Sequence, residues 1–231
     1  DSRDSTSMRE IVPDFVGALD RDITGLRIGW SPDYGFATVD EEVLDVSLKA
    51  ARVFEGFGCD LEESDLVMES PYDAYGPIFE ADIFAGYGQY RESHAAQMTD
   101  FVKDYIDWGS KITAADYARA LGLRDRLMAQ MTDLFEKYDL LLTPTACFPA
   151  FPNEKFPGSI RGKSTYPEQY WNGAFTLPIN VTGNPAANIP AGFSSNGLPI
   201  GLHIVGRMND EETVLSASAA FELPSPSESP T

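Results

Sequence analysis

Residues 25–65 have the order strand, helix, strand, and this order constrains the fold more than any other stretch of the chain. The apolar run "GLRIGW" is followed by residues 40–57, in which Val43, Val46 and Ala50 recur at helical spacing. Glycines end this helix, and "CDLEES" then reads as the next strand. A strand–helix–strand unit brings its two strands together in parallel. The sequence therefore predicts an α/β protein.

The second half of the chain adds a long helix and an antiparallel hairpin. Residues 113–138 form the strongest helix pattern, with Thr113 and Asp116 in the positions of a capping box. The run "YDLLLTPT" after it is typical of a buried strand. "AANIP" and "IGLHIVG" are two further strands, joined by a turn at Asn196-Gly197. With a last helix at 210–222, we predict a mixed β-sheet sandwiched between helices.

The domain organisation is predicted as one α/β region over residues 25–223. Residues 1–24 read as an extended lead-in with a short helix near 13–21, and residues 224–231 as a disordered tail. Residues 66–111 are helical and rich in aromatic side chains, which fits core packing, a cap or a dimer surface. Residues 146–168 are rich in proline and glycine and are expected to form a long loop.

Charge and residue usage narrow the function classes. The chain has 36 acidic and 17 basic residues, a net charge of −19, which argues against nucleic acid as a partner. No apolar run approaches the ~20 residues of a membrane helix, so we expect a soluble protein. Its two cysteines are expected to be free thiols in a reducing compartment, and a cytoplasmic location is predicted. The only cysteines are Cys59 and Cys147, and the chain has two histidines. With no CxxC pair, neither a metal site nor a cofactor is expected.

Residues 175–193, "FTLPINVTGNPAANIPAGF", concentrate residues that restrict the backbone. Pro178, Pro185 and Pro190 each fix φ and remove an N–H donor. Gly183 and Gly192 allow turns that other residues resist. One interpretation is a rigid path held closely against a neighbouring segment. The other is an ordinary helix–strand connection with its prolines in an edge strand.

Together these segments resemble the C-terminal half of the amidase signature enzymes, which hydrolyse carbon–nitrogen amide bonds. The resemblance covers residues 1–223 and rests on "LRIGW", "ITAADYARALGLRDRL", "YDLLLTPT", and above all "PINVTGNPAANIPAGF" with "GLPIGLHIVGR". It implies a partial domain, because the family's serine nucleophile, second serine and lysine lie in a Gly/Ser-rich N-terminal half that we do not find here. The opening "DSRDSTSMRE", without a starting Met, fits a processed or partial chain.

No catalytic residue is therefore expected in this chain, which alone should be inactive. An activated serine needs a base within hydrogen-bond reach and donors for the oxyanion. Ser194 and Ser195 in "GFSSNG" read instead as a hairpin turn. Lys103 in "FVKDYID" reads as a solvated lysine on a helix.

Two segments carry the candidate substrate-binding residues. The loop after "LLLTPT" follows the carboxyl end of a strand, where α/β proteins form ligand sites, and it offers Thr145, Cys147 and Phe148. Cys147 is read as a pocket wall or as core packing, and not as a nucleophile, because no base lies near it in the sequence. The resemblance implies that "YWNGAFTL" lines the substrate channel, through Trp171, Asn172, Gly173 and Leu177.

The resemblance also bears on the substrate and the partners. Glutamine amidotransferases of the family have an Asp where this chain has Gly173, and arginines where it has only Lys103. Without these charges the site cannot compensate the desolvation of a zwitterion, so a neutral amide with an apolar or aromatic acyl group is predicted. The expected partners are the N-terminal catalytic half, the small-molecule amide and, as often in the family, a second copy in a homodimer. The alternative is a non-catalytic α/β interaction subunit that retains the fold.

Overall fold

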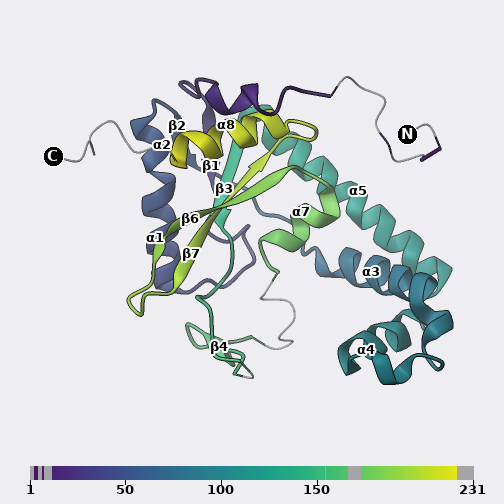
Figure 1. Cartoon of the computed structure of the whole chain (residues 1–231). Helices are drawn as coiled ribbons and strands as arrows, with labels where there is room; N and C mark the ends of the chain where they lie inside the picture. Colours follow the sequence, from purple (N-terminus) through teal and green to yellow (C-terminus); the bar gives the residue numbers. More distant parts are fainter. Residues whose placement is uncertain (1–2, 5–6, 8–11, 154, 166–172, 223–231) are drawn as a thin grey trace.

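The computed structural model describes residues 3–4, 7, 12–153, 155–165 and 173–222, and its centre is a five-stranded sheet (Figure 1). The strands of this sheet are β1 (Arg27–Trp30), β2 (Asp60–Glu63), β3 (Leu140–Pro144), β6 (Ala186–Phe193) and β7 (Pro199–Gly206). Their order is β2-β1-β3-β7-β6. β1 runs parallel to β2 and β3, whereas β7 runs antiparallel to β3 and β6. The mixed sheet predicted from the sequence is confirmed.

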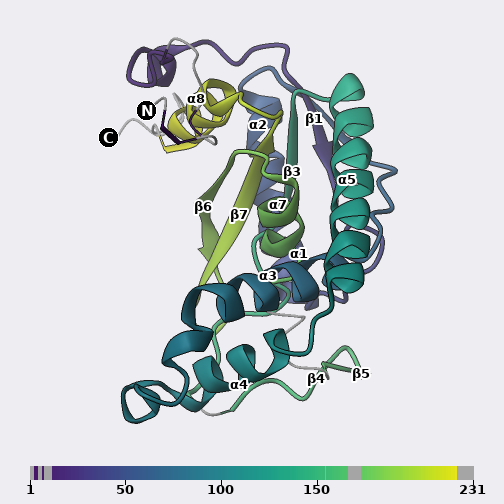
Figure 2. The same ribbon diagram turned by 90° about the vertical axis from the view of Figure 1, so that its right-hand side faces the viewer.

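Helices cover both faces of the sheet. The helices are α1 (Glu41–Ala51), α2 (Val53–Gly56), α3 (Tyr72–Tyr87), α4 (Asp100–Gly109), α5 (Ala114–Lys137), α7 (Thr176–Thr182) and α8 (Glu211–Glu222). The 3-10 helices are η1 (Gly17–Asp20), η2 (Gly88–Tyr90) and η3 (Ala95–Gln97). α1, α2 and α8 pack on one face, and α5 and α7 on the other (Figure 2). No helix in the described ranges has the length and apolar character needed to cross a bilayer.

The strand–helix–strand unit forms as its sequence predicts. Asp40 caps α1, because its carboxylate accepts a hydrogen bond from the Glu42 N–H at 2.9 Å. The turn into β2 passes through Gly58, whose φ of +82° is one that other residues rarely adopt. β1 and β2 then pair in parallel, with Arg27 opposite Asp60.

The hairpin of β6 and β7 supplies one edge of the sheet, and β2 forms the other. Its turn is closed by a hydrogen bond from Gly197 N–H to the Ser194 carbonyl at 2.8 Å, and Leu198 N–H donates to the Ser194 hydroxyl at 3.0 Å. Ser194 and Ser195 thus lie in a turn, as predicted. β6 is the edge strand, and its register shifts between Pro190 and Gly192. Proline is tolerated there because an edge strand has no second neighbour to which it must donate.

Two apolar clusters, one on each face of the sheet, form the core. On one face, Leu127 of α5 and Phe175 before α7 pack in the same cluster as Leu141. On the other, Phe54 of α2 packs in a cluster with Leu140. Every residue of β3 is buried, so this central strand is covered on both faces, as "YDLLLTPT" predicts.

Asp139 links the end of α5 to the start of β3. Its carboxylate accepts hydrogen bonds from the Arg27 backbone N–H at 2.9 Å and from the Arg207 guanidinium at 2.6 Å. Arg207 also donates to the carbonyl of Phe135 at 3.1 Å, and so satisfies the carboxyl end of the helix. Burial of Asp139 would raise its pKa, but the hydrogen bonds from Arg27 and Arg207 outweigh that effect and hold the pKa below its usual value.

We expect Asp139→Asn to lower the free energy of unfolding at neutral pH by about 1–2 kcal/mol, since charge-assisted hydrogen bonds are lost. The expected loss is modest because the side chains of Arg27 and Arg207 are 48% and 40% exposed. Because the folded pKa is depressed, this stability is present above the unfolded pKa of about 3.9 and is lost as pH falls through the folded value. Urea unfolding at pH 7 and pH 3 checks both points. Asp45→Asn on α1 is the control, and an equal loss at both pH values would contradict the assignment.

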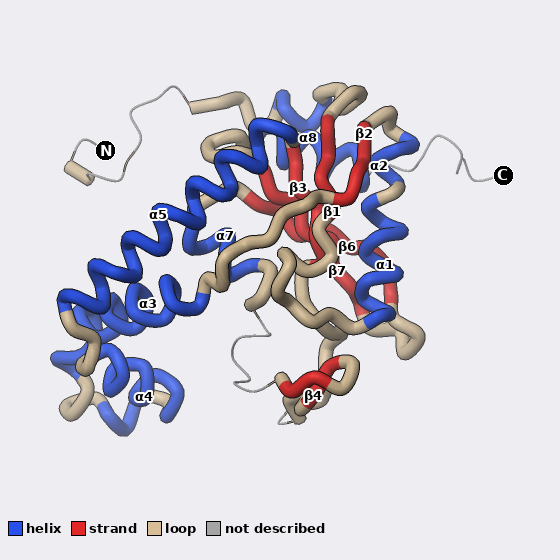
Figure 3. The backbone as a smooth tube through the Cα atoms, turned by 180° about the vertical axis from the view of Figure 1, so that it is seen from behind, coloured by secondary structure: helices blue, strands red, loops and turns tan. Residues whose placement is uncertain are grey.

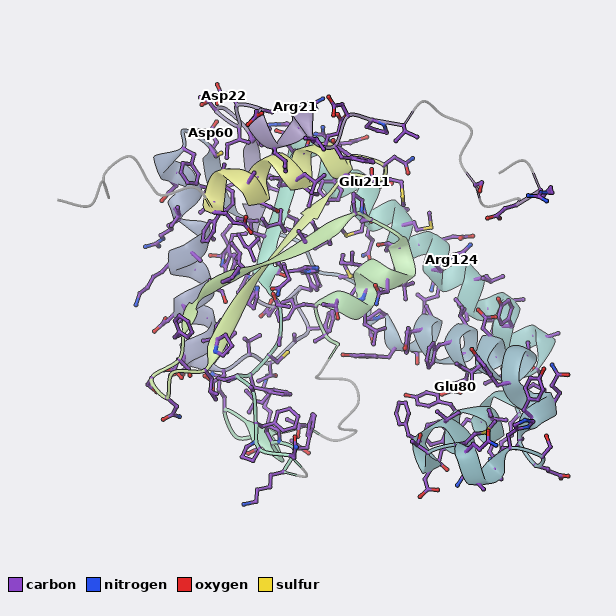
Figure 4. The ribbon with its side chains drawn as sticks, in the orientation of Figure 1. Arg21, Asp22, Asp60, Glu80, Arg124 and Glu211 are labelled. Atoms are coloured by element: carbon purple, nitrogen blue, oxygen red, sulfur yellow. The ribbon has the colours of Figure 1, made fainter. Side chains whose placement is uncertain are left out.

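Helices α3 and α4 form an arm that extends away from the sheet (Figure 3). They approach closely, because a Cβ at Gly109 would clash with the Glu80 carbonyl oxygen. Glu80 itself lies on this arm, far from the sheet (Figure 4), and burial raises its pKa. The exposed aromatic side chains of the arm are Phe84, Tyr87, Tyr90, Phe101 and Trp108. The sequence-based choice between a cap and a dimer surface stays open.

Two segments differ from the prediction: the loop at 146–168 has more regular structure than expected, and the segment at 13–21 has less. The long loop at 146–168 contains a small hairpin of β4 (Ser159–Ile160) and β5 (Lys163–Ser164). The helix expected near 13–21 is only the 3-10 turn η1, which is held to α8 by the Ser216 hydroxyl donating to the Ala18 carbonyl at 2.7 Å. Arg21, labelled in Figure 4, pairs with Glu212 of α8 at 2.6 Å. The predicted tail at 224–231 lies outside the described residues.

Candidate functional site

A cavity of about 290 Å³ lies where β3 ends and β7 begins. It is lined by Val43, Thr145, Ala146, Phe148, Pro149, Ala150, Phe151, Asn188, Pro199, Ile200 and Gly201. These residues come from α1, from the loop after β3 and from the two strands of the edge hairpin. The carboxyl edge of a strand in an open α/β sheet is where such proteins bind ligands.

The floor of this cavity depends on the absence of a side chain at Gly201. A Cβ at that position would clash with Asn188 Oδ1 and would lie 2.7 Å from Thr145 Oγ1. The space is instead occupied by these two polar side chains, and the Thr145 hydroxyl donates to Asn188 Oδ1. The Thr145 backbone N–H donates to the Gly201 carbonyl at 3.2 Å, which fixes the start of the loop on β7.

The walls of the cavity are apolar and partly aromatic. Phe148 and Phe151 contact each other edge to face, with ring centroids 5.6 Å apart. Phe156 packs against both rings from behind, at 5.4 and 5.2 Å. Among the described residues that line the cavity, none is charged. Such a wall accepts an apolar group and penalises a charged one.

The structure brings some of the predicted site residues together and separates others. Thr145 and Phe148 line the cavity, while Cys147 between them is completely buried in the core behind it. Burial raises the pKa of the Cys147 thiol to about 12, so it is a neutral packing group and not a nucleophile. Gly173 and Leu177 lie next to each other at the start of α7, where the Leu177 N–H donates to the Gly173 carbonyl, and neither lines the cavity.

Trp171 and Asn172 lie outside the described residues. The substrate-binding role predicted for all seven positions stays a prediction.

Asn188, Ile200 and Gly201 line the cavity but were not predicted. They lie more than forty residues beyond Thr145 in the sequence, and only the pairing of β3, β7 and β6 brings them beside it. For Asn188, the sequence signal that could have indicated a site residue is its polar side chain within the apolar run "AANIP".

The histidine of the core and the lysine named above are buried or already paired in the described part of the chain. His203 of β7 lies in the core with its Nδ1 3.5 Å from the Thr143 hydroxyl, and burial lowers its pKa to about 4, so it is neutral. Lys103 pairs with Asp100 at 2.8 Å on the arm. Within the described ranges, no group of three or more His, Cys, Asp or Glu side chains could hold a metal ion.

A larger cavity of about 580 Å³ lies by the outer strand β2 and contains none of the predicted site residues. Two of its polar groups are already paired with each other, since the Tyr138 hydroxyl donates to Glu62 at 2.8 Å. We therefore take the smaller cavity as the candidate site.

The mixed sheet with helices on both faces makes this chain an α/β protein, and its candidate site lies at the carboxyl end of the central strand β3. Residues 1–215 match the sequence model of the family described as Amidase, and the chain belongs to that family. It is 31% identical to an acylamidase of Rhodococcus erythropolis over 98% of its own length and 48% of the relative's. It is also 33% identical to a component of the glutamyl-tRNA(Gln) amidotransferase of Granulibacter bethesdensis, over 96% of this chain and 48% of that one.

Solved structures agree with this assignment. A bacterial aryl acylamidase of the amidase signature enzymes superposes with a TM-score of 0.85 at 31% identity, covering 96% of this chain and 48% of that one. A 6-aminohexanoate cyclic dimer hydrolase superposes with a TM-score of 0.75 at 22% identity, which shows the shared fold. The chain spans about half the length of the curated relatives that it matches.

Proposed function

We propose that this chain is part of an enzyme that hydrolyses the C–N bond of a neutral carboxylic amide. The observation that carries the proposal is membership of the amidase family, combined with a neutral, apolar cavity at the carboxyl end of β3. The serine nucleophile would come from a segment outside these 231 residues, because the relatives are about twice as long. In this arrangement the chain contributes part of the sheet and a wall of the substrate pocket.

The edge strand β6 is where we propose that the other segment pairs. Gly206 N–H donates to the Pro185 carbonyl at 2.9 Å, and hydrogen-bonded pairs alternate along an antiparallel ladder. The backbone groups of Ala186 and Asn188 therefore face away from β7, and no strand in the described part of the chain pairs with them. An unpaired edge of this kind favours the addition of a strand.

The cavity favours an apolar or aromatic group on the substrate amide. Its rings and the neutral side chains of its described lining residues fit a neutral amide, and a charged amino acid would lose its hydration without a compensating partner among them. This favours an acylamidase-like substrate over the glutamine amide that an amidotransferase uses. The homodimer and the cytoplasmic location expected from the sequence stay predictions.

The test is hydrolysis by the chain alone and by the protein expressed from its complete coding sequence. We expect the complete protein to hydrolyse anilides and aryl amides at least about tenfold faster than glutamine, in line with the effect of one mismatched group in a pocket. The chain alone should have no activity. Activity of the lone chain would disprove the external nucleophile. A complete protein that hydrolyses no amide would favour the non-catalytic interaction subunit.

A further inference from the structure

Asn188 is a polar side chain in an otherwise apolar edge strand. It lies on β6 directly opposite His203 of β7, yet unlike His203 it is exposed. Its side chain lies over Gly201 and lines the candidate cavity beside Thr145. Because it is exposed, its polar side chain is accessible to a molecule that enters the cavity.

Among the described residues, the hydrogen bonding of Asn188 uses its oxygen and not its nitrogen. The Thr145 hydroxyl donates to Oδ1, which fixes the orientation of the amide plane. Nδ2 carries two N–H donors, and it makes no hydrogen bond to another described residue. The site therefore offers a neutral, oriented donor beside an apolar wall.

The size of the cavity indicates what this donor can meet. A cavity of about 150 Å³ is enough to hold benzene, and this one has about 290 Å³. This volume is enough for one ring against Phe148 and Phe151, together with a small polar substituent beside Asn188. Small-molecule pockets commonly combine such a wall with a few polar groups that fix orientation.

We propose that Asn188 is a specificity-determining residue, whose Nδ2 donates a hydrogen bond to a neutral acceptor oxygen on the aromatic group that enters the cavity. Thr145 is the positioning residue that holds the amide in this orientation. Assigning the bound group to an amide substrate rests on the function proposed above, but the recognition of a neutral oxygen-bearing ring does not. The described lining residues carry no charge, which favours a carbonyl oxygen over a carboxylate.

The test compares ligand binding by the complete protein and by Asn188→Asp. Aspartate can still accept the Thr145 hydrogen bond, but it has no N–H donors. The probes are benzamide, which has an acceptor oxygen, and toluene, which has none, with affinities taken from ¹⁵N–¹H spectra. We expect the dissociation constant for benzamide to rise about tenfold and that for toluene to stay within about twofold.

The matched control is Asn196→Asp, which makes the same change in the exposed turn between β6 and β7 and should leave both affinities unchanged. Thr145→Val is a second variant, which should weaken benzamide binding while Asn188 is retained. Benzamide binding that is absent in the wild type, or insensitive to Asn188→Asp, would overturn the inference, as would an equal loss for toluene.

Hydrolysis is measured separately in the same proteins. Ring recognition that depends on Asn188, in a protein that hydrolyses no amide, would reject the proposed function and keep this inference. If the protein hydrolyses aryl amides but binds benzamide independently of Asn188, the proposed function is kept and this inference is rejected.

Discussion

Replacing Phe54 by alanine is expected to lower the free energy of unfolding by about 3–5 kcal/mol, the range measured for large aromatic truncations in cores. Phe54 is fully buried in the cluster between the sheet and the α1, α2 and α8 layer. Its ring stacks on Phe221 of α8 with centroids 5.8 Å apart and contacts Phe57 edge to face at 6.0 Å. The cavity left by alanine has rigid neighbours on several sides, so collapse can recover little of the loss.

The neighbouring residue provides the control for this prediction. Val53 lies on the same short helix but is 39% exposed, so Val53→Ala should cost less than about 1 kcal/mol. Chemical unfolding followed by circular dichroism measures both variants. A loss below about 1 kcal/mol for Phe54→Ala would mean that α2 and α8 do not pack as described. Because Phe54 lies on the opposite face from the aromatic cavity wall, the folded variant should bind benzamide as the wild type does.

Local patterns in the sequence predict the capping box of α5, the buried strand β3 and the turn of the hairpin. Thr113 and Asp116 form the predicted capping box, with each side chain bonded to the other residue's backbone N–H. The three leucines of β3 are fully buried because a strand in the middle of a sheet has both faces covered. Asn196-Gly197 marks the hairpin because Gly197 has a φ of +75°. In the capping box and the hairpin turn, the residues that interact lie within a few positions of one another. The leucines of β3 are indicated by their composition alone, because their partners in β1 and β7 are distant in the sequence.

The cavity could be predicted only in part, because it joins segments that are far apart in the sequence. Thr145 and Phe148 were found because they follow the carboxyl end of a strand. Asn188 and Gly201 depend on the strand order β3-β7-β6, which no local pattern encodes. The role of Gly173 in the substrate channel is implied only by the resemblance and stays a prediction, and in the described structure Gly173 does not line this cavity.

Gly201→Ala is expected to lower kcat/KM for an aryl amide by about a hundredfold or more, because small misplacements in a binding site have effects of this size. The new Cβ would clash with Asn188 Oδ1 and meet Thr145 Oγ1 at 2.7 Å, so both side chains must leave the floor of the cavity. The oriented donor and the space for the ring are then lost together. Steady-state kinetics of the complete protein and benzamide binding measure the two effects independently.

Two comparisons separate this local effect from a general loss of structure. Gly122→Ala adds the same methyl group on α5, where a Cβ meets no atom within 4 Å. It should keep full activity and gain up to about 1 kcal/mol of stability, because alanine favours the helix over glycine. Adding Asn188→Ala to Gly201→Ala removes the closest contact, so stability should recover while benzamide binding does not. If Gly201→Ala binds benzamide and hydrolyses aryl amides normally, this cavity is not the substrate site.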